Sequence, residues 1–316
     1  MIYCIQNFII KNIVLFFKIV IFIIFLFFVF IYLSIFKIKK LPKVCICTVA
    51  KEENRYIREF IEHYKKYGID KIFLYDNNNM NGEKYENVIS DYIRNKFVEI
   101  IDFREIPTPQ LKAYNDCYKR NNKLFDWLIF FDIDEFIYLK DFSDIKLFLN
   151  DKRFKNCERV QLNWVFHTDN NLIYYENRSV VERFPEWEPN AKGKKIGGNQ
   201  GIKSILRGRL RNIKIICPHT LSPKPRNCDG FGNLKNITGI ITKISDFEYY
   251  YIEHYSCKSV EEFIKKINNT DVFHKEDNRI AKINWYLSYN KITKQKIDLI
   301  EKATKINLSE YRKLIF

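Results

Sequence analysis

Short apolar runs recur along the first half of the chain, and each is bounded by polar residues. Four of these runs predict strands: Val44–Val49, Lys71–Tyr75, Phe97–Ile101 and Trp127–Phe131. A continuous apolar run of this length is typical of a strand that is buried on both faces, as in a parallel sheet. We therefore expect these strands to form the centre of the fold.

Amphipathic stretches separate the apolar runs and predict helices. Apolar residues recur at helical spacing from Ile57 to Tyr64, and Gly68 stands where such a helix would end. Residues 85–95 and 110–119 are the next two candidate helices. Strands that alternate with helices predict right-handed crossovers and an α/β fold, in which helices cover a parallel sheet on both faces.

Polar residues follow each of the four predicted strands. In open α/β sheets, ligands bind at the carboxyl ends of the strands. One polar strand end is typical of any solvated loop, whereas four that meet at one edge favour a binding site. These ends are Lys51–Asn54, Asp76–Asn79, Asp102–Arg104 and Asp132–Glu135.

The pattern becomes mixed after residue 150. Residues 185–201 are rich in Gly, Lys and Asn and predict a loop. Residues 258–267 predict a helix that Ser259 and Glu262 open as a capping box, and the tail that follows has a helical, basic pattern. Further strands are expected over residues 159–166, 180–184, 204–206 and 212–216.

Residues 19–36 are almost entirely apolar. This length approaches the roughly 20 residues that cross a bilayer as a helix. The apolar stretch extends back to residue 13 across Lys18, whose side chain can reach the interface. A cleaved signal peptide is the alternative, but no small-residue cleavage site follows. We therefore predict a single-pass membrane anchor over residues 13–36.

The orientation of this anchor has two interpretations. Lysines cluster after the span, at 37, 39, 40 and 43, and this charge bias favours the cytoplasmic side for the domain that follows. The opposite topology, with the domain in the Golgi lumen, is expected for a eukaryotic type II protein. We expect three parts: an anchor with its basic flank over residues 1–40, an α/β domain over 41–257 and a helical extension over 258–316.

Charge and cysteine content change this picture little. The formal net charge is +15, but no Lys/Arg block with interleaved aromatics is present, so we expect no nucleic-acid partner. The spacing of the eight cysteines indicates neither a zinc site nor a disulfide framework. Cys45 and Cys47 are expected to be small core residues on opposite sides of a strand. Pairing among Cys217, Cys228 and Cys257 is a further hypothesis for an oxidising lumen.

Asp132-Ile133-Asp134, directly after the fourth apolar run, is the most informative motif. A diphosphate held by Mg²⁺ or Mn²⁺ needs hard oxygen ligands, and two carboxylates at a strand end supply them. A solvated turn is the alternative, and the position in an α/β array favours the metal site. Phosphatases of the haloacid dehalogenase type carry such a motif on their first strand rather than on their fourth.

Several motifs together resemble glycosyltransferase family 92 and its family 2 relatives, over roughly residues 44–267. They are Val44–Glu53 with Tyr56–Phe60, Tyr75–Asn78, Phe131–Phe136, Asn163–Phe166, and His254-Tyr255 followed by Lys258-Ser259 and Glu262-Phe263. The resemblance implies a GT-A fold, a nucleotide-sugar donor, a divalent metal ion, and transfer of a hexose such as galactose to a glycan with inversion.

The resemblance also implies roles for individual residues. Asp132 and Asp134 would hold the donor's metal ion, with His254 as a later ligand, and Asp76 would contact the base or ribose. The other donor-binding candidates are Lys51, Glu53, Asn78 and Lys203. The chain departs from the family pattern in two places: Glu52 replaces an asparagine, and His167 replaces a glycine.

Inverting transfer needs a carboxylate that takes a proton from the acceptor hydroxyl. Glu182 and Asp229 are the candidate bases. For either one, a surface carboxylate paired with a neighbour is the simpler interpretation. The candidate cations for the leaving diphosphate are Lys203, Arg207 and Lys258, while His219 and Trp164 are candidates for contact with a sugar.

The acidic motif and the resemblance together imply a metal-dependent inverting glycosyltransferase that uses Mn²⁺ or Mg²⁺ and a UDP-sugar. A noncatalytic, membrane-tethered binding module on a degenerate fold is the alternative. A nucleotidyltransferase is less favoured, because residues 51–54 lack the Gly-rich basic loop of that class.

Overall fold

The chain forms two compact units, Met1–Leu41 and Pro42–Phe316. The computed structural model describes residues 16–29, 40–187, 201–235, 246–268 and 279–308.

In the first unit, the described residues form a helix over 16–29 with mostly exposed apolar side chains. Across the ranges that the structure describes, no helix is both long enough and apolar enough to cross a membrane. Residues 13–15 and 30–36 of the predicted anchor lie outside the described residues.

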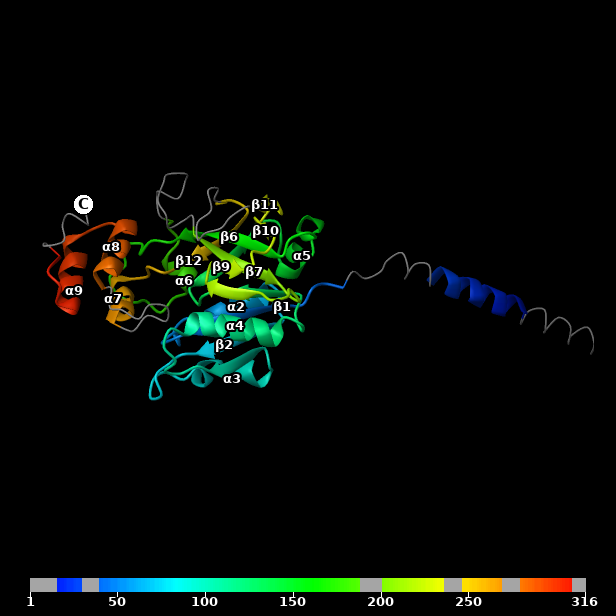
Figure 1. Cartoon of the computed structure of the whole chain (residues 1–316), viewed down its shortest axis with the longest axis horizontal. Coiled ribbons are helices and arrows are strands. Elements are labelled where there is room, and N and C mark those ends of the chain that lie inside the picture. Colours follow the sequence, from blue (N-terminus) through cyan, green and yellow to red (C-terminus); the bar gives the residue numbers. More distant parts are fainter. Residues whose placement is uncertain (1–15, 30–39, 188–200, 236–245, 269–278, 309–316) are drawn as a thin grey trace, which may run out of the picture. The chain divides into compact units, whose positions relative to one another are not determined.

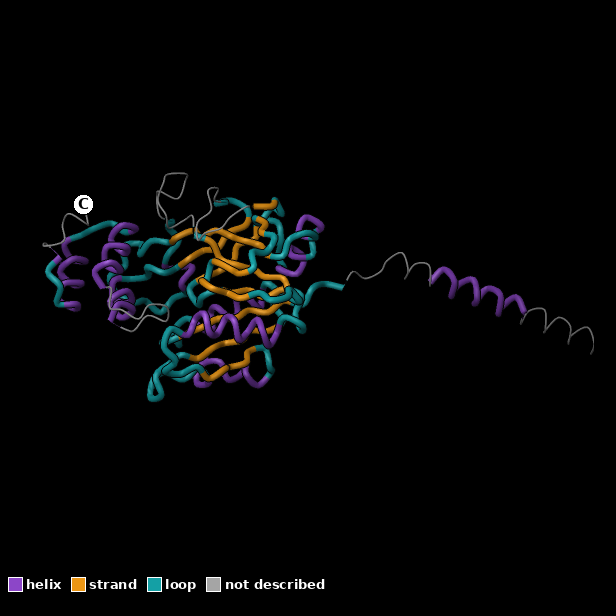
Figure 2. Tube along the Cα trace, viewed as in Figure 1, coloured by secondary structure: helices purple, strands orange, loops and turns teal. Residues whose placement is uncertain are grey.

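A ten-stranded sheet, counted over the described residues, forms the centre of the second unit, and a two-stranded sheet accompanies it (Figure 1, Figure 2). The strands are β1 Val44–Ala50, β2 Lys71–Asp76, β3 Val98–Asp102, β4 Trp127–Phe130, β5 Glu135–Leu139, β6 Arg159–Phe166, β7 Ile202–Arg207, β8 Lys214–Cys217, β9 Thr220–Ser222, β10 Asn227–Cys228, β11 Leu234–Lys235 and β12 Tyr250–His254.

The main path of the large sheet has the order β11-β10-β6-β7-β4-β1-β2-β3. β1 is parallel to both β2 and β4, and β2 is parallel to β3, which confirms the predicted parallel core. β7 then runs antiparallel between β4 and β6, while β12 is parallel to β6 and antiparallel to β5. The carboxyl ends of β1, β2, β3 and β4 therefore meet at one edge.

Helices cover both faces of the sheet, as predicted. They are α2 Ile57–Lys66, α3 Glu86–Arg94, α4 Pro109–Asn121, α5 Ile145–Leu149, α6 Val180–Arg183, α7 Val260–Asn268, α8 Arg279–Tyr289 and α9 Lys294–Thr304, with a 3₁₀ turn at Lys152–Phe154. α2 and α3 pack with Val44 and Ile46 on one face, and α4 packs with Cys45 and Cys47 on the other.

Two local predictions are wrong. Cys45 and Cys47 share one face of β1, because residues two apart in a strand point to the same side. Residues Val180–Arg183 form a short helix rather than a strand. The Ser179 hydroxyl accepts a hydrogen bond from the Glu182 backbone N–H at 3.1 Å and opens that helix.

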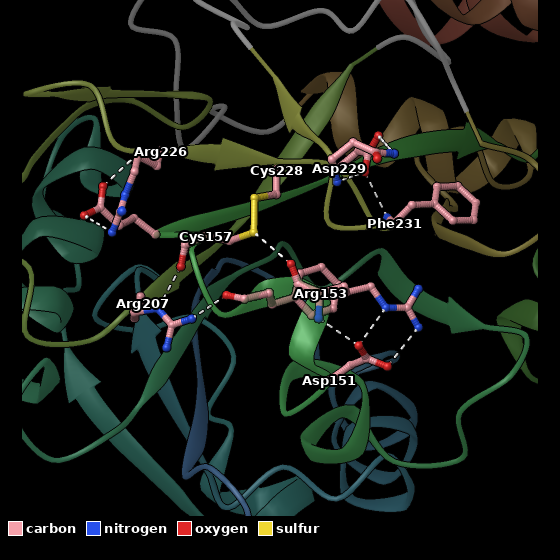
Figure 3. The surroundings of a disulfide bond; sticks show 11 residues. Asp151, Arg153, Cys157, Arg207, Arg226, Cys228, Asp229 and Phe231 are labelled. Atoms are coloured by element: carbon pink, nitrogen blue, oxygen red, sulfur yellow. Dashed lines mark hydrogen bonds and ion pairs between the residues drawn. A yellow bond between two sulfur atoms is a disulfide. The ribbon is translucent and has the colours of Figure 1, made fainter.

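Two disulfides join distant parts of the second unit. Cys47 pairs with Cys117, which links β1 to α4, and Cys157 pairs with Cys228, which links the start of β6 to β10 (Figure 3). Cys217 and Cys257 are free thiols, so the hypothesis that pairs them with Cys228 or with each other is wrong. The sequence offered no local signal for either pair, because the partners are 70 and 71 residues apart.

Replacing both Cys157 and Cys228 with alanine is expected to lower the free energy of unfolding by about 2–4 kcal/mol. The disulfide closes a loop of 71 residues and restricts the unfolded chain. Urea unfolding of the wild type and of the double variant, with and without reductant, measures the effect. An equal midpoint for the two oxidised proteins would contradict it.

The C-terminal helices α7, α8 and α9 bury their own apolar cluster against Phe166 at the end of β6. A buried polar connection joins them to the loop after that strand. Lys296 Nζ lies 2.6 Å from Asp169 Oδ2, and the Tyr286 hydroxyl donates to the same oxygen at 2.7 Å. The helical extension is therefore fixed to the sheet close to the end of β6.

Candidate active site

The loops after β1 and β2 are held together by the side chains that follow β2. The Asn78 side-chain oxygen accepts a hydrogen bond from the Glu52 N–H at 2.7 Å, and the Asp76 carboxylate accepts one from the Asn78 N–H at 2.9 Å. Glu52 has φ of +57°, a left-handed conformation that this hydrogen bond supports. Asn78 is fully buried and so acts as a brace between the loops, while burial raises the pKa of Asp76.

Asp132 is enclosed by three donors. Its Oδ1 accepts hydrogen bonds from Gln110 Nε2 and from the Tyr114 hydroxyl, both at 2.9 Å, and its Oδ2 lies 2.7 Å from Lys203 Nζ. Burial alone would raise the pKa of Asp132, but the charge of Lys203, together with the hydrogen bonds from Lys203 and Tyr114, holds the pKa below its usual value. The carboxylate is therefore ionised and fixed in direction.

Gln110 and Tyr114 were missed by the sequence analysis. They lie four residues apart on α4, so they share the face of that helix that packs on the sheet. Their spacing is also that of ordinary core positions, which is why the pattern gave no functional signal.

Asp134 faces a histidine and a lysine. Its Oδ1 lies 3.4 Å from His254 Nε2, and its Oδ2 lies 3.2 Å from Lys266 Nζ. Burial alone would raise the pKa of Asp134, but the charges of Lys266 and His254 hold it well below the usual range. The structure thus brings two of the predicted metal ligands, Asp134 and His254, side by side.

Glu135 lies beneath the motif in the core and holds the backbone of Asp132. The side chain is fully buried, and its Oε2 accepts a hydrogen bond from the Asp132 N–H at 3.1 Å. Its Oε1 has no hydrogen-bond partner but lies 3.4 Å from Lys203 Nζ and 4.0 Å from His254 Nε2. Burial raises the pKa of Glu135 well above its usual value, although Lys203 opposes that shift.

Asp134 and His254 fit a divalent cation whose remaining ligands would come from a bound phosphate and from water. Among the described residues, no group of three or more His, Cys, Asp or Glu side chains is arranged to hold a metal ion by itself. Two ligands of one octahedral ion, each at about 2.1 Å, lie about 3 Å apart. The 3.4 Å between Asp134 and His254 is close to that spacing. Mg²⁺ and Mn²⁺ accept a few protein ligands and complete their shell with phosphate oxygens and water.

Glu53 and Lys258 form a second, partly buried contact at the end of β1. Lys258 Nζ lies 3.7 Å from Glu53 Oε2 and 3.5 Å from the centre of the Tyr56 ring. Burial raises the pKa of Glu53, although Lys258 opposes that shift. Lys51 lies at the same strand end, and its side chain is half-buried.

The two candidate bases lie in different settings. Glu182 is exposed on the short helix α6. Asp229 closes the turn between β10 and β11: its Oδ1 accepts hydrogen bonds from the N–H groups of Phe231 and Asn233, and its Oδ2 lies 3.1 Å from Lys235 Nζ (Figure 3). Asp229 therefore stabilises the turn. Among the described residues, neither Glu182 nor Asp229 contacts Asp132 or Asp134.

Aromatic rings surround His254. The centroid of the Trp164 ring lies 4.9 Å from the His254 ring and 5.1 Å from the His219 ring. Burial, with the charge of Lys203, lowers the pKa of His219 to about 4, so its imidazole is neutral. Its Nδ1 lies 2.6 Å from the Ile202 carbonyl, which assigns the proton to Nδ1 and leaves Nε2 as an acceptor.

Arg207 does not reach the acidic edge. Its guanidinium lies over the Trp127 ring at the start of β4 and donates to the carbonyls of Phe154 and Cys157, at 2.7 Å each. It stabilises the opposite end of the sheet. Lys203, by contrast, lies on β7 across from Leu162 and points to Asp132.

The sequence from β1 to α9 matches one protein family. The model of Glycosyltransferase family 92 covers residues 43–308. The chain belongs to glycosyltransferase family 92. This confirms the resemblance carried by the strand-end motifs.

Individual relatives match over shorter stretches. A family 92 protein of Ricinus communis is 30% identical over 105 residues, which cover 32% of this chain and 18% of the relative. One from Oryza sativa subsp. japonica is 27% identical over 100 residues, which cover 32% of this chain and 17% of the relative. The matched stretch thus spans less than a fifth of the length of these relatives.

Solved structures are similar at low sequence identity. TarS of S. aureus, residues 1–349 in complex with UDP, is 11% identical with a TM-score of 0.37, over 86% of this chain and 73% of that one. The mannosyltransferase PcManGT of Pyrobaculum calidifontis, in complex with GDP-Man and Mn²⁺, is 11% identical with a TM-score of 0.35, over 88% and 84%.

Proposed function

We propose that the chain transfers a hexose, galactose or a similar sugar, from a UDP-sugar to a glycan acceptor with inversion and with the help of Mn²⁺ or Mg²⁺. Membership of family 92 supports the reaction class. The observation that carries the proposal is the cluster at the carboxyl end of β4, where ionised Asp132 and Asp134 lie with His254 and Lys203.

In this mechanism each residue of the cluster has a separate task. Asp134 and His254 would hold the cation, which supplies Lewis-acid stabilisation of the leaving diphosphate. Asp132 would face the donor in the direction that Gln110 and Tyr114 fix. Glu135 holds the Asp132 backbone from within the core. These groups are oriented before the donor arrives, so little reorganisation is needed during transfer.

The proton of the acceptor hydroxyl needs a base, and Glu182 and Asp229 stay the candidates for it. Glu182 is the better placed to change partners, because its carboxylate is exposed. Asp229 would have to give up its hydrogen bonds to the turn. Loss of transfer in Glu182→Gln, with donor binding unchanged, would support Glu182; unchanged transfer in that variant would exclude it.

We further propose that the second unit works in an oxidising compartment, which corresponds to the Golgi-lumen alternative. Two disulfides within the described residues support this orientation, since such bonds are rare in proteins of the reducing cytosol. The lysines after the predicted anchor favour the opposite side, so the two signals disagree. Protease protection of the second unit in intact microsomes distinguishes them.

The direct test of the reaction uses the full-length chain in detergent micelles. It is incubated with UDP-galactose, UDP-glucose or GDP-mannose and a mixed glycan acceptor, with Mn²⁺ or with a chelator. Metal-dependent release of UDP, with the product's anomeric configuration read by NMR, would support the proposal. No release of any nucleotide by folded protein would favour the noncatalytic binding module.

A further inference from the structure

Helix α7 places two lysines against acids of the site. Lys266 Nζ lies 3.2 Å from Asp134 Oδ2. Lys265 Nζ lies 3.7 Å from Glu52 after β1 and 3.5 Å from Glu83 in the loop after β2. One helix turn therefore contacts acids from three separate loops at the edge where the strands end.

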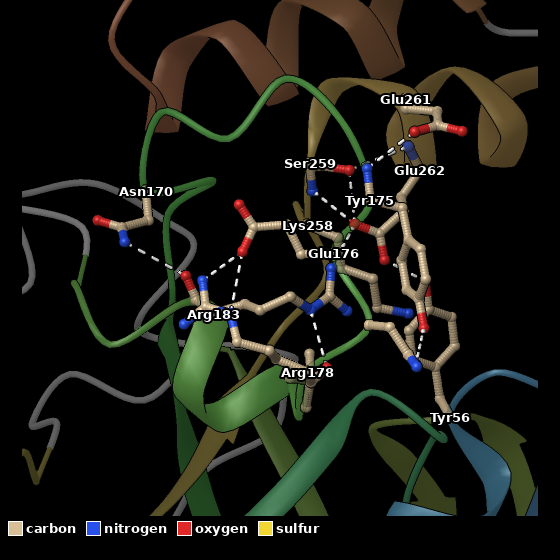
Figure 4. Close-up of polar contacts among 12 residues, drawn as sticks. Tyr56, Asn170, Tyr175, Glu176, Arg178, Arg183, Lys258, Ser259, Glu261 and Glu262 are labelled. Atoms are coloured by element: carbon tan, nitrogen blue, oxygen red, sulfur yellow. Dashed lines mark hydrogen bonds and ion pairs between the residues drawn. The ribbon is translucent and has the colours of Figure 1, made fainter.

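The N-terminal end of α7 is fixed by buried polar contacts (Figure 4). The Glu262 carboxylate accepts hydrogen bonds from the Ser259 N–H at 3.1 Å and from Arg183 Nη1 at 2.7 Å. The Tyr56 hydroxyl also donates to Glu262. Arg183 and Glu262 are almost completely buried as a pair. These contacts hold the start of α7 in place. They thereby fix the position of its last turn, which carries Lys265 and Lys266.

Lys265 and Lys266 differ from the other lysines of the site in exposure. Their side chains are 44% and 54% exposed, whereas the Lys203 and Lys258 side chains are 1% and 7% exposed. Lys203 and Lys258 are therefore held by the core, whereas the ammonium groups of Lys265 and Lys266 reach solvent. Their acid partners are more buried, since the Glu52, Glu83 and Asp134 side chains are 25%, 27% and 9% exposed.

The acidic edge needs such cations when an anionic ligand arrives. A nucleoside diphosphate is negatively charged, and it would approach Glu52, Glu53, Glu83 and Asp134 together. Like charges at close range repel, and a mobile ammonium group offsets this repulsion. Lysine also binds phosphate as a point charge without a fixed geometry.

We propose that Lys266, assisted by Lys265, binds the diphosphate of the donor. In the donor-free protein Lys266 neutralises Asp134, and on donor binding its ammonium group turns from that carboxylate to the phosphate oxygens of the donor. This inference deepens the proposed function and rests on it. It assigns part of donor recognition to the C-terminal helical region, which the strand-end motifs alone did not include.

The effect of Lys266 on metal binding distinguishes a role in donor binding from a merely structural role. Lys266 and a divalent cation share the same carboxylate, so they compete for Asp134. Removing the lysine charge should therefore tighten the binding of Mn²⁺ alone by about three- to tenfold. The same change should weaken the binding of UDP in saturating Mn²⁺ by about tenfold, because a charged hydrogen bond to phosphate is lost.

The test compares wild type, Lys266→Met and Lys266→Arg as full-length chains in detergent. Calorimetry measures UDP binding in saturating Mn²⁺, and electron paramagnetic resonance measures the binding of Mn²⁺ without nucleotide. We expect opposite shifts in the methionine variant and recovery of UDP binding in the arginine variant. Lys302→Met, at an exposed position of α9, is the matched control and should leave both constants unchanged.

The outcomes separate the two proposals. If the wild type binds UDP in Mn²⁺ and Lys266→Met binds it equally well, the role of Lys266 is excluded and the proposed function stands. If UDP binding weakens but Lys266→Arg does not recover it, a charge contact with phosphate is excluded. If the wild type binds neither UDP nor GDP, the proposed function fails, and the inference fails with it.

Discussion

Asparagine in place of Asp134 is expected to lower the rate of sugar transfer by about 10³-fold, because the change removes a charge aimed at the reacting groups. Asp134 is ionised and lies 3.4 Å from His254 Nε2. Asparagine keeps the shape of the side chain but cannot neutralise a cation. The two partners that lose the negative charge, Lys266 and His254, have side chains 54% and 12% exposed. The asparagine oxygen can still accept a hydrogen bond, so the fold should keep most of its stability.

The measurement is metal-dependent release of UDP by Asp134→Asn beside the wild type, with circular dichroism to show that both are folded. Asp91→Asn is the matched control, because Asp91 on α3 forms an exposed ion pair with Arg58 on α2. The control should retain full activity. Transfer by Asp134→Asn within a few fold of wild type would show that this carboxylate does not take part in the reaction.

Methionine in place of Lys296 is expected to lower the free energy of unfolding by about 3–5 kcal/mol, because it leaves a buried carboxylate without its cation. The Lys296 and Asp169 side chains are 1% and 2% exposed, and their charged atoms lie 2.6 Å apart. Asp169 joins the loop after β6 to α8 and α9. For a unit of this size the loss corresponds to a melting temperature lower by roughly 10 °C.

Thermal unfolding of Lys296→Met and Lys302→Met compares a buried with an exposed lysine of the same helix. The exposed control should melt with the wild type. The double variant Asp169→Asn with Lys296→Met should recover part of the loss, since no buried charge is then left unpaired. Equal melting of wild type and Lys296→Met would mean that water or another group compensates Asp169.

The parallel core could be predicted from the sequence because its signal is local. A strand buried on both faces needs a continuous apolar run, and each of the four runs from Val44 to Phe131 became a strand. The helix at Val180–Arg183 could not be read in this way. It depends on the Ser179 cap and on the buried pair between Arg183 and Glu262, whose partners are 79 residues apart.

The residues of the candidate site also divide into those with a local sequence signal and those that only tertiary packing brings together. Asp132 and Asp134 carry a compact motif at a strand end, and the family pattern located His254, which the structure places beside Asp134. Gln110 and Lys266 have no such motif. Each stands in an amphipathic helix pattern, and only the packing of α4 and α7 against the strand ends brings their side chains to the two aspartates.

The cysteines show the limit of spacing arguments. A pair such as Cys47 and Cys117 has no short-range pattern, since a strand and a helix bring the two together over the face of the sheet. The register of β1 also places Cys45 beside Cys47 on that face, where only one of the two can reach Cys117. Tertiary packing decided which thiol paired.

The central claim is a metal-dependent nucleotide-sugar site at Asp132 and Asp134, and calorimetric titration of UDP into the full-length chain tests it most directly. Asp134→Asn is the better variant for this test, because removing Asp132 would take from the buried Lys203 its nearer carboxylate and leave only Glu135 at 3.4 Å. We predict UDP binding in Mn²⁺ that is lost in chelator and in Asp134→Asn. Equal UDP binding by wild type and variant, or binding that chelator leaves unchanged, would contradict the account.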